Sequence, residues 1–441
     1  MTAPLPRTAL GRRAARVTAT LAERLADPAG VAATATAPGN LDHRPGRPPA
    51  PPFRAASLAE GHAGIALLFA ELAARDGTPR HRATAHAHLT AATAHLASSP
   101  DQGLYHGAAA VAFAAATARR TTDDYAVLLS RLDRRVSAAL GRTLAAEEER
   151  MRSGRPGTSA RSYDVVSGAT GLGRYLLLRG EPHRALLTRT LSCLVRMTEP
   201  VTAHGRRVPG WWVPHGTDGP FSHVFPRGHF DVGLAHGVPG PLALLALAHR
   251  AGVRVPGQDT AITGIADWLL RRRTPAAPWP PVIGFDQHTS RTTRPPPGRT
   301  AWCYGTPGVA RALYLAGRAL DRPDWCTAAL RALTEALAAP GELVDSALCH
   351  GWAGVLHVTW LMAHDSGNPQ LAGSLPWLAE KVLNDYDADA PFGYRYRSPG
   401  QQAAIDRAGF LQGAAGIALA LDAYARNLPP TTRWDAALLL T

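Results

Sequence analysis

Two cysteines and one histidine have the types and the spacing needed to bind a transition metal. Cys303 and Cys349 are 46 residues apart, and His350 directly follows the second cysteine. Each cysteine lies two residues before the first glycine of a Gly-x-x-Gly motif, at Gly305 and Gly351, so we expect the two thiols to occupy equivalent positions in consecutive repeats. Two thiolates and one imidazole suit zinc, and three protein ligands leave the fourth tetrahedral position open for a substrate.

The alternative interpretation is that these residues fill the core, because a buried cysteine usually behaves as a small apolar side chain. The matching repeat positions favour a metal site for Cys303 and Cys349. Cys193 lies within an apolar helical run and Cys326 lies beside Trp325, so we expect both to be core residues. Four cysteines without a Cys-x-x-Cys pair exclude a disulfide scaffold and indicate reduced thiols, as in a cytoplasm.

The Gly-x-x-Gly motif recurs seven times and organises the whole chain. Successive first glycines are 46 to 69 residues apart, which gives each repeat room for two helices and two connections. The second copy has alanine in place of its second glycine. The first glycines are Gly61, Gly107, Gly168, Gly237, Gly305, Gly351 and Gly413.

Two kinds of helix alternate along these repeats. Small apolar residues follow each motif at nearly every position, as in 417–421, which predicts a helix buried on all sides. Between the motifs, apolar residues recur at spacings of three and four, as in 330–337 and 375–382, which is typical of amphipathic helices. Buried helices enclosed by amphipathic ones form an α/α toroid, so the predicted fold class is all-α, with about seven helical hairpins.

The residue before the first glycine, which we call the mouth residue of each repeat, is polar in every copy. Packing alone would favour small apolar residues at this position. The seven mouth residues are Glu60, His106, Ser167, His236, Tyr304, His350 and Gln412. We expect them to converge at one end of the toroid, in a polar mouth that carries the chemistry. The motif itself is a weak indication of nucleotide binding, because no strand pattern precedes it.

The repeats also determine the predicted domain organisation. A length of 441 residues would suggest roughly three domains, but the repeats predict a single toroid domain over residues 1–441. Proline- and glycine-rich stretches interrupt the repeats at 28–56, 200–230 and 274–300. The last two lead directly into mouth residues, so we expect them to act as lids or substrate-contacting loops. There is room for a small β-containing insertion within 177–230.

The net charge of +13 raises the question of an anionic partner. Lys381 is the only lysine, so the positive charge is almost entirely arginine and reflects a composition bias as much as a polyanion partner. Nucleic-acid binding therefore has no further support. No stretch approaches 18 uninterrupted apolar residues, and the first residues lack a compact apolar segment. We therefore predict a cytoplasmic protein without an export signal or an integral membrane segment.

Three motifs resemble those of the lanthionine synthetase C-like family, the cyclases of class I lanthipeptide biosynthesis. Residues 302–308, Trp-Cys-Tyr-Gly-Thr-Pro-Gly, and 349–354, Cys-His-Gly-Trp-Ala-Gly, are similar to the two zinc motifs of the family. Residues 233–240, Gly-Leu-Ala-His-Gly-Val-Pro-Gly, resemble its active-site histidine motif. The resemblance spans nearly the whole chain and implies an α/α toroid with one zinc ion.

The resemblance also implies roles for individual residues. The zinc ligands would be Cys303, Cys349 and His350, and the acid or base would be His236. The other active-site positions would be Asp164, within Tyr-Asp-Val-Val at 163–166, together with Arg299 and Tyr304. The alternatives are that Asp164 caps a helix N-terminus and that Arg299 is one solvated arginine among many.

The reaction that the resemblance implies is closure of a thioether ring within a peptide. Zinc lowers the pKa of a substrate thiol and keeps the thiolate at neutral pH. That thiolate adds to the β-carbon of a dehydroalanine or dehydrobutyrine, and the enolate takes a proton at Cα. His236 would transfer this proton, with Asp164 orienting the imidazole or a water. Arg299 and Tyr304 would donate to the enolate oxygen.

The expected partners are a lanthipeptide precursor, consisting of a leader and a dehydrated core, and in many class I systems a dehydratase and a transporter. Such a complex would hold the enzyme at a membrane. Two other functions remain open at this point: a zinc toroid protein prenyltransferase, and a non-catalytic thiol- or peptide-binding protein of the same family. A glycosidase would need paired carboxylates in the mouth, which the motifs do not supply.

Overall fold

The computed structural model describes residues 8–43, 48–214, 224–273, 279–290, 298–341, 343–397 and 404–441. Within these residues the chain is mostly helical, with three two-stranded antiparallel sheets. The contacts divide the chain into two compact units. The first unit contains Met1–Asp101, Tyr105–Arg135 and Glu342–Asp435, and the second contains Gln102–Leu104, Val136–Gly341 and Ala436–Thr441.

The first unit contains four helices that begin at a Gly-x-x-Gly motif and are buried along most of their length. These buried helices are α3 (His62–Asp76), α5 (Gly107–Ala118), α15 (Trp352–Ser366) and α17 (Ala414–Arg426). Its amphipathic helices are α1 (Ala9–Arg24), α4 (Pro79–Ala94), α16 (Pro369–Asn384) and the first turns of α6 (Ala126–Arg152). The remaining elements are α2 (Pro28–Ala35), η1 (Leu96–Ser98) and the hairpin of β5 (Arg395–Tyr396) with β6 (Ile405–Asp406).

The second unit repeats this arrangement with three buried helices. These are α8 (Ala169–Arg179), α10 (Pro239–Arg250) and α13 (Thr306–Ala319). The amphipathic helices are the rest of α6, α9 (Arg184–Met197), α11 (Gln258–Arg272) and α14 (Pro323–Ala338). The short elements are α7 (Ala160–Tyr163), η2 (Glu181–His183), α12 (Phe285–Ser290), β1 (Val201–Ala203), β2 (Arg206–Val208), β3 (His229–Asp231) and β4 (Val282–Gly284), and η3 (Trp434–Leu438) follows α17.

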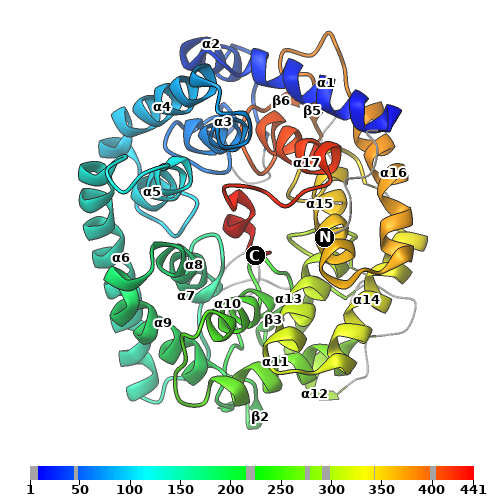
Figure 1. The fold of residues 1–441 in the computed structure, drawn as a ribbon. Coiled ribbons are helices and arrows are strands. Elements are labelled where there is room, and N and C mark those ends of the chain that lie inside the picture. Colours follow the sequence, from blue (N-terminus) through cyan, green and yellow to red (C-terminus); the bar gives the residue numbers. More distant parts are fainter. Residues whose placement is uncertain are drawn as a thin grey trace. The chain divides into compact units, whose positions relative to one another are not determined.

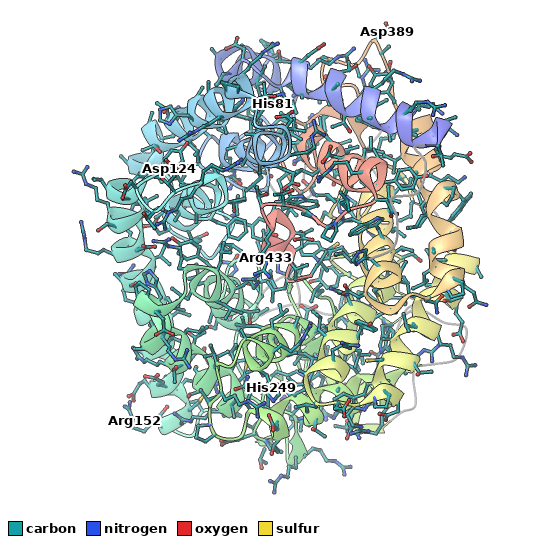
Figure 2. All side chains as sticks on the ribbon, in the orientation of Figure 1. His81, Asp124, Arg152, His249, Asp389 and Arg433 are labelled. Carbon is teal, nitrogen blue, oxygen red and sulfur yellow. The ribbon has the colours of Figure 1, made fainter. Side chains whose placement is uncertain are left out.

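Pairs of one buried and one amphipathic helix form the packing unit of the protein. The buried helix packs against the amphipathic helix that follows it in α3/α4, α8/α9, α10/α11, α13/α14 and α15/α16. The last buried helix, α17, packs instead against α1 from the other end of the chain, and the two lie side by side in Figure 1. The amphipathic helices keep charged residues toward water, as at Arg152 of α6 (Figure 2).

The second glycine of the motif allows a close backbone approach that recurs along the chain. In six copies, a Cβ at this glycine would lie 1.8 to 3.0 Å from the carbonyl oxygen of the residue six positions earlier. Any larger residue would push that segment away. The pairs are Gly64 with Leu58, Gly171 with Val165, Gly240 with Leu234, Gly308 with Trp302, Gly354 with Leu348, and Gly416 with Phe410. The segment before each of these helices is thereby held against the first turn.

This contact gives the mouth residues a common environment. All seven are half-buried, whereas the glycine that follows each of them is buried. In the first unit they are Glu60, His106, His350 and Gln412, and in the second unit they are Ser167, His236 and Tyr304. The repeat therefore presents one polar side chain per copy at a partly open position.

The stretches that we expected to be irregular contain some regular structure. Residues 28–35 form α2, because the Asp27 carboxylate accepts hydrogen bonds from the N–H groups of Ala29 and Gly30 at the helix start. The β1–β2 hairpin lies within the range where we allowed for a β-containing insertion. Strands β3 and β4 pair and so join the 200–230 and 274–300 stretches. Residues 215–223, 274–278 and 291–297 of these two predicted lids lie outside the described residues.

Among the described residues, no helix has both the length and the apolar character that crossing a membrane requires.

Candidate active site

Cys303, Cys349 and His350 form a group that could hold a metal ion. Two sulfur atoms and one imidazole nitrogen, one from each residue, all lie within 4.8 Å of one another. All three residues are half-buried, and neither cysteine is in a disulfide. Among the described residues, no other group of three or more histidine, cysteine or acidic side chains is placed to hold a metal ion.

The backbone around each motif explains why the mouth residues are held in equivalent ways. In five copies, the N–H of the residue after the first glycine donates to the carbonyl of the residue six positions before that glycine, at 3.0 to 3.3 Å. The donors are His62, Val238, Thr306, Trp352 and Ala414, and the acceptors are Ala55, Asp231, Arg299, Asp345 and Arg407. Each of these bonds closes a loop that carries the mouth residue.

The Cys303 loop needs glycine at two positions. Gly305 has φ 138°, and a Cβ there would lie 1.7 Å from the carbonyl oxygen of Arg299. A Cβ at Gly233 would lie 2.4 Å from the carbonyl oxygen of Cys303. The same carbonyl accepts a hydrogen bond from Ala235 at 3.2 Å. The segment that carries Cys303 is therefore fixed against the segment that carries His236.

His236 is oriented by a direct hydrogen bond to Asp164. Its Nδ1 lies 2.6 Å from Asp164 Oδ2, and the side chains are 38% and 2% exposed. Asp164 Oδ1 also accepts from the backbone N–H of Ser167, so the carboxylate supports the turn before α8 as well as the imidazole. Burial works to lower the pKa of His236, but the Asp164 hydrogen bond and the charges of Asp164 and Asp231 outweigh it and raise that pKa.

Tyr304 lies beside this pair and contacts a second carboxylate. Its ring centre is 5.8 Å from that of His236, and its hydroxyl donates to Asp231 Oδ2 at 3.4 Å. Burial, reinforced by the charges of Asp231 and Cys303, raises the pKa of Tyr304 well above its usual range. Burial also raises the pKa of Asp231 to about 6. Tyr304 is therefore a neutral hydroxyl donor at physiological pH.

Arg299 is placed differently from the other predicted residues. Its carbonyl closes the Gly305 loop, but its side chain is exposed and makes no hydrogen bond or ion pair with any described residue. The structure thus brings His236, Asp164 and Tyr304 together and leaves the Arg299 guanidinium facing solvent.

Asp231 and Asp345 are two acidic residues near the site that the sequence analysis did not single out. Asp231 contacts Tyr304, and Asp345 Oδ2 lies 3.7 Å from Nε2 of His350. Both lie six positions before the first glycine of their motif. That position is charged in five of the seven copies: Asp101, Asp231, Arg299, Asp345 and Arg407. Alignment of the repeats at this position, as well as at the mouth residue, was the signal that could have found them.

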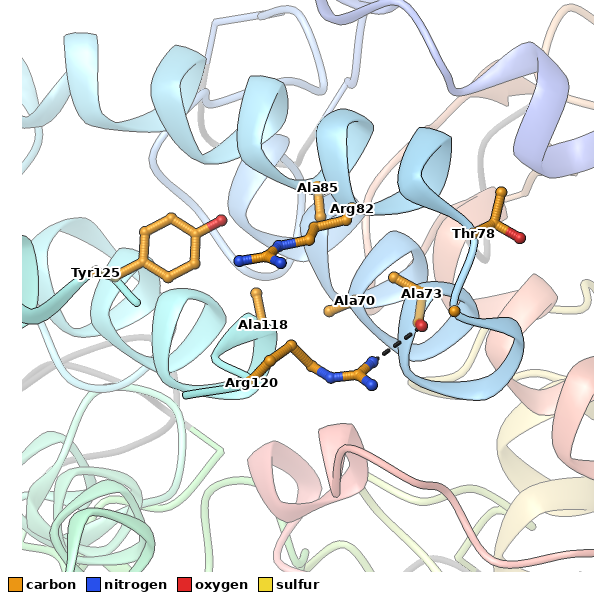
Figure 3. A pocket seen from close by; sticks show the side chains of 9 residues that line it. Ala70, Ala73, Thr78, Arg82, Ala85, Ala118, Arg120 and Tyr125 are labelled. Carbon is orange, nitrogen blue, oxygen red and sulfur yellow. Dashed lines mark hydrogen bonds between the residues drawn. The ribbon is translucent and has the colours of Figure 1, made fainter. Parts of the chain in front are cut away.

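A separate pocket lies in the first unit. It has a volume of about 180 Å³ and is lined by residues of α3, α4, the end of α5, and the connections from α3 to α4 and from α5 to α6. Figure 3 shows Arg82, Arg120 and Tyr125 pointing toward it, with Arg120 Nη1 donating to the Ala73 carbonyl at 2.9 Å. None of the candidate site residues lines this pocket, so it is not the place of the chemistry described above.

Comparisons with known proteins agree with the motifs. The family model described as lanthionine synthetase C-like protein matches residues 52–439. The chain is 23% identical over 402 residues to the nisin biosynthesis protein NisC of Lactococcus lactis subsp. lactis, an alignment that covers 88% of this chain and 90% of that protein. The solved structure of nisin cyclase matches with a TM-score of 0.73 and 21% identity, over 98% of this chain and 97% of that chain. The structural match confirms the predicted α/α toroid fold.

Proposed function

Because the chain belongs to the lanthionine synthetase C-like family, we propose that it is a zinc-dependent lanthipeptide cyclase. Its substrate would be a precursor peptide with a leader and a core that contains dehydroalanine or dehydrobutyrine together with cysteine. The observation that carries the proposal is the group of two thiols and one imidazole whose ligand atoms lie within 4.8 Å of one another. The family match favours the cyclase over a prenyltransferase. The His236–Asp164 pair favours the cyclase over a non-catalytic thiol-binding protein of the same family, because a binder needs no acid or base.

The donor set fits zinc by its chemistry. Cys303, Cys349 and His350 supply two sulfurs and one nitrogen, which zinc prefers, and leave one tetrahedral position for a substrate sulfur. Zinc in this site would lower the pKa of the substrate thiol and keep it as a nucleophilic thiolate. The two cysteine ligands would supply enough negative charge to keep that sulfur reactive.

His236 is suited to donate the proton that completes the addition. When the substrate sulfur bonds to Cβ, the electron pair of the carbon–carbon double bond moves onto Cα and the adjacent carbonyl oxygen. The imidazolium form of His236, which Asp164 favours, then gives its Nε2 proton to Cα. The thiol proton lost at the start restores the imidazolium, so the reaction needs no other reactant.

Tyr304 and Arg299 are the proposed donors to the enolate oxygen. Tyr304 stays protonated, and its 3.4 Å contact with Asp231 is long for an O–H donor, so the hydroxyl can turn toward a substrate oxygen at small cost. The exposed Arg299 side chain has the length and freedom to reach the same oxygen once a peptide is bound. Both would act as oxyanion donors.

The proposed setting follows from the family. We propose that the protein acts in a cytoplasm on a dehydrated precursor, together with a dehydratase and a transporter that would bring it to a membrane. These partners are inferred from the family and from no contact surface of this chain.

Metal analysis of protein purified without chelator tests the proposal. We expect about one zinc per chain in the wild type, and loss of zinc together with ring formation in Cys303→Ala and Cys349→Ala. Cys193→Ala is the matched control, because Cys193 is buried in α9 and burial raises the pKa of its thiol to about 12. A wild type without zinc, or a Cys303→Ala variant with full cyclisation of a dehydrated peptide, would sink the proposal.

A further inference from the structure

We propose that Asp345 is a positioning residue for His350. Its buried carboxylate would hold the Nε2 side of the imidazole, so that Nδ1 is the nitrogen presented to the metal. The inference rests on the proposed zinc site and extends it, because the ligand motifs name His350 but not Asp345.

The contact itself is the first argument. Asp345 Oδ2 lies 3.7 Å from His350 Nε2, and the two side chains are 2% and 14% exposed. A buried carboxylate oxygen is costly unless it accepts a hydrogen bond. Oδ2 of Asp345 has no donor within hydrogen-bond distance among the described residues, and the backbone N–H of Arg397 is the other backbone donor that acts on this carboxylate. A small rotation of the imidazole toward Oδ2 would satisfy this oxygen with the Nε2 proton.

Asp345 is also fixed more firmly than an ordinary loop carboxylate. Its Oδ1 accepts from the backbone N–H of Ala347 at 2.8 Å, and its carbonyl accepts from Trp352 at 3.1 Å. A Cβ at Gly351 would lie 2.4 Å from Asp345 Oδ1, so the chain around His350 is packed directly against this carboxylate. The position of Oδ2 is therefore set by the backbone of the ligand loop.

A second side chain limits rotation of the His350 ring. Tyr396 of β5 meets it edge to face, with ring centres 5.5 Å apart. Tyr396 is held in turn by the guanidinium of Arg407, 4.4 Å above its ring, and by Gln412, whose Nε2 donates to the hydroxyl at 3.3 Å. His350 is thus bounded by Asp345 and Tyr396.

The chain has an acidic residue at the same position in another repeat, which supports the inference. Asp231 precedes His236 by five residues, as Asp345 precedes His350, and both pairs occupy equivalent positions of the motif. The charge of Asp231 acts on His236. An acidic residue at this position therefore interacts electrostatically with a mouth histidine in both copies. Carboxylates that receive the second N–H of a metal-binding histidine commonly change metal affinity by about 10- to 100-fold.

Zinc affinity measured by chelator competition tests the inference. In Asp345→Asn the side-chain oxygen can still accept from Ala347, but an amide N–H₂ would face Nε2. We expect zinc to bind about 10- to 100-fold more weakly, and we expect most ring-forming activity to return at saturating zinc. Ser346→Ala is the matched control, because the neighbouring Ser346 hydroxyl donates to Asp385 instead; its zinc affinity should equal that of the wild type.

The outcomes separate this inference from the proposed function. A wild type that binds no zinc removes the cyclase proposal, whereas Asp345→Asn with wild-type zinc affinity overturns only the role of Asp345. If Asp345→Asn does not fold, Asp345→Ser keeps a hydroxyl acceptor for Ala347 without the carboxylate, and the same 10- to 100-fold loss is expected. In ¹⁵N-histidine-labelled zinc protein, metal bound through Nε2 of His350 would equally overturn the inference.

Discussion

At the residue scale, His236 is held by one carboxylate and faces the charge of another. Oδ2 of Asp164 lies 2.6 Å from Nδ1 of His236, and Asp231 adds a buried negative charge nearby. Both favour the imidazolium, which is the form that donates a proton. Because the pKa of His236 is raised, this acid should stay available to a higher pH than that of a free histidine.

Asp164→Asn should therefore shift the pH profile of ring formation. Loss of the Asp164 charge lowers the pKa of His236, so activity should fall at a lower pH on the alkaline side, and kcat should drop by about 10²-fold or more. The measurement is kcat and kcat/KM for a dehydrated peptide between pH 5.5 and 9. Asp389→Asn is the control, because Asp389 is an exposed carboxylate on the loop after α16 (Figure 2). An unchanged alkaline limb in Asp164→Asn would contradict this role.

The proximity of the three predicted metal ligands could be inferred from the sequence because their residue types and repeat positions agreed. Cys303, Cys349 and His350 could be grouped because both cysteines precede a motif by the same spacing. Asp345 could not be assigned in the same way, because its role depends on a carboxylate that the local backbone turns toward His350. Single aspartates are common in loops, and only the fold distinguishes this one.

At the scale of elements, the loops before the buried helices hold the candidate site residues, and their glycines make those loops possible. Gly305 has a positive φ of 138°, which favours glycine. A Cβ at this position would also lie 1.7 Å from the carbonyl oxygen of Arg299. Such a residue cannot be replaced without moving the Cys303 segment.

Gly305→Ala should lower the free energy of unfolding by about 3 kcal/mol or more and reduce zinc binding, because the Cys303 loop must shift. Gly264→Ala is the matched control: Gly264 is exposed within α11, and no atom lies within 4 Å of the added Cβ. This change should raise the free energy of unfolding by about 0.5–1 kcal/mol. Urea unfolding and metal analysis measure both effects, and equal stability of the two variants would contradict the loop model.

A buried histidine pair links α1, α3 and α4 in the first unit. Nε2 of His88 donates to the Leu25 carbonyl at 2.8 Å, so Nδ1 of His88 is the acceptor in this ring. This Nδ1 accepts a hydrogen bond from Nδ1 of His62 at 3.1 Å, and both side chains are buried. Burial lowers the pKa of each to about 4. In the unfolded chain the two histidines have pKa values near 6.5. Between about pH 4 and pH 6.5, the unfolded chain therefore binds more protons than the folded chain.

The free energy of unfolding should thus be constant above about pH 6.5 and fall as the pH decreases toward about 4. Urea unfolding at several pH values measures this slope. His62→Phe should reduce this slope, although the buried His88 still contributes to it. Replacement of the exposed His86 by Asn should leave the slope unchanged. The same slope in His62→Phe and the wild type would show that other groups cause the loss of stability.

Helices were easier to predict than their partners and connections. The buried helices begin where the glycine motifs indicated, because the motif encodes a close approach that recurs in six copies. The packing of α1 on α17 was not predicted, because the two helices are far apart in the sequence and no sequence pattern in either one indicates that they pack together. The short strands were not placed either, since two- and three-residue strands are too brief to show an alternating pattern.

At the scale of the whole molecule, repeat spacing was a better guide than length. The chain length, at about 150 residues per domain, would have suggested three domains. The seven copies of one motif predict an α/α toroid instead, and the match to nisin cyclase confirms that fold. The family membership predicted from three short motifs is confirmed over residues 52–439. The single-domain prediction for 1–441 and the lid role of the two long stretches remain predictions.

The net charge of +13 predicts attraction to an acidic leader peptide. Between about 50 and 300 mM salt, the Kd for such a precursor should rise several-fold, because screening weakens the attraction. Fluorescence anisotropy with a labelled precursor measures this change, and a charge-neutralised leader of the same length is the control. Equal salt dependence for both leaders would remove the electrostatic contribution.

The central claim is tested most directly by counting free thiols in a dehydrated peptide that contains cysteine and dehydroalanine or dehydrobutyrine. Ring closure adds the thiol across the double bond without changing the peptide mass, so trapping with N-ethylmaleimide and mass spectrometry distinguishes substrate from product. The zinc-loaded wild type should remove the reactive thiols, and His236→Ala should leave them with zinc still bound. If the zinc-loaded wild type leaves the thiols reactive at the uncatalysed rate, the protein is not a lanthipeptide cyclase.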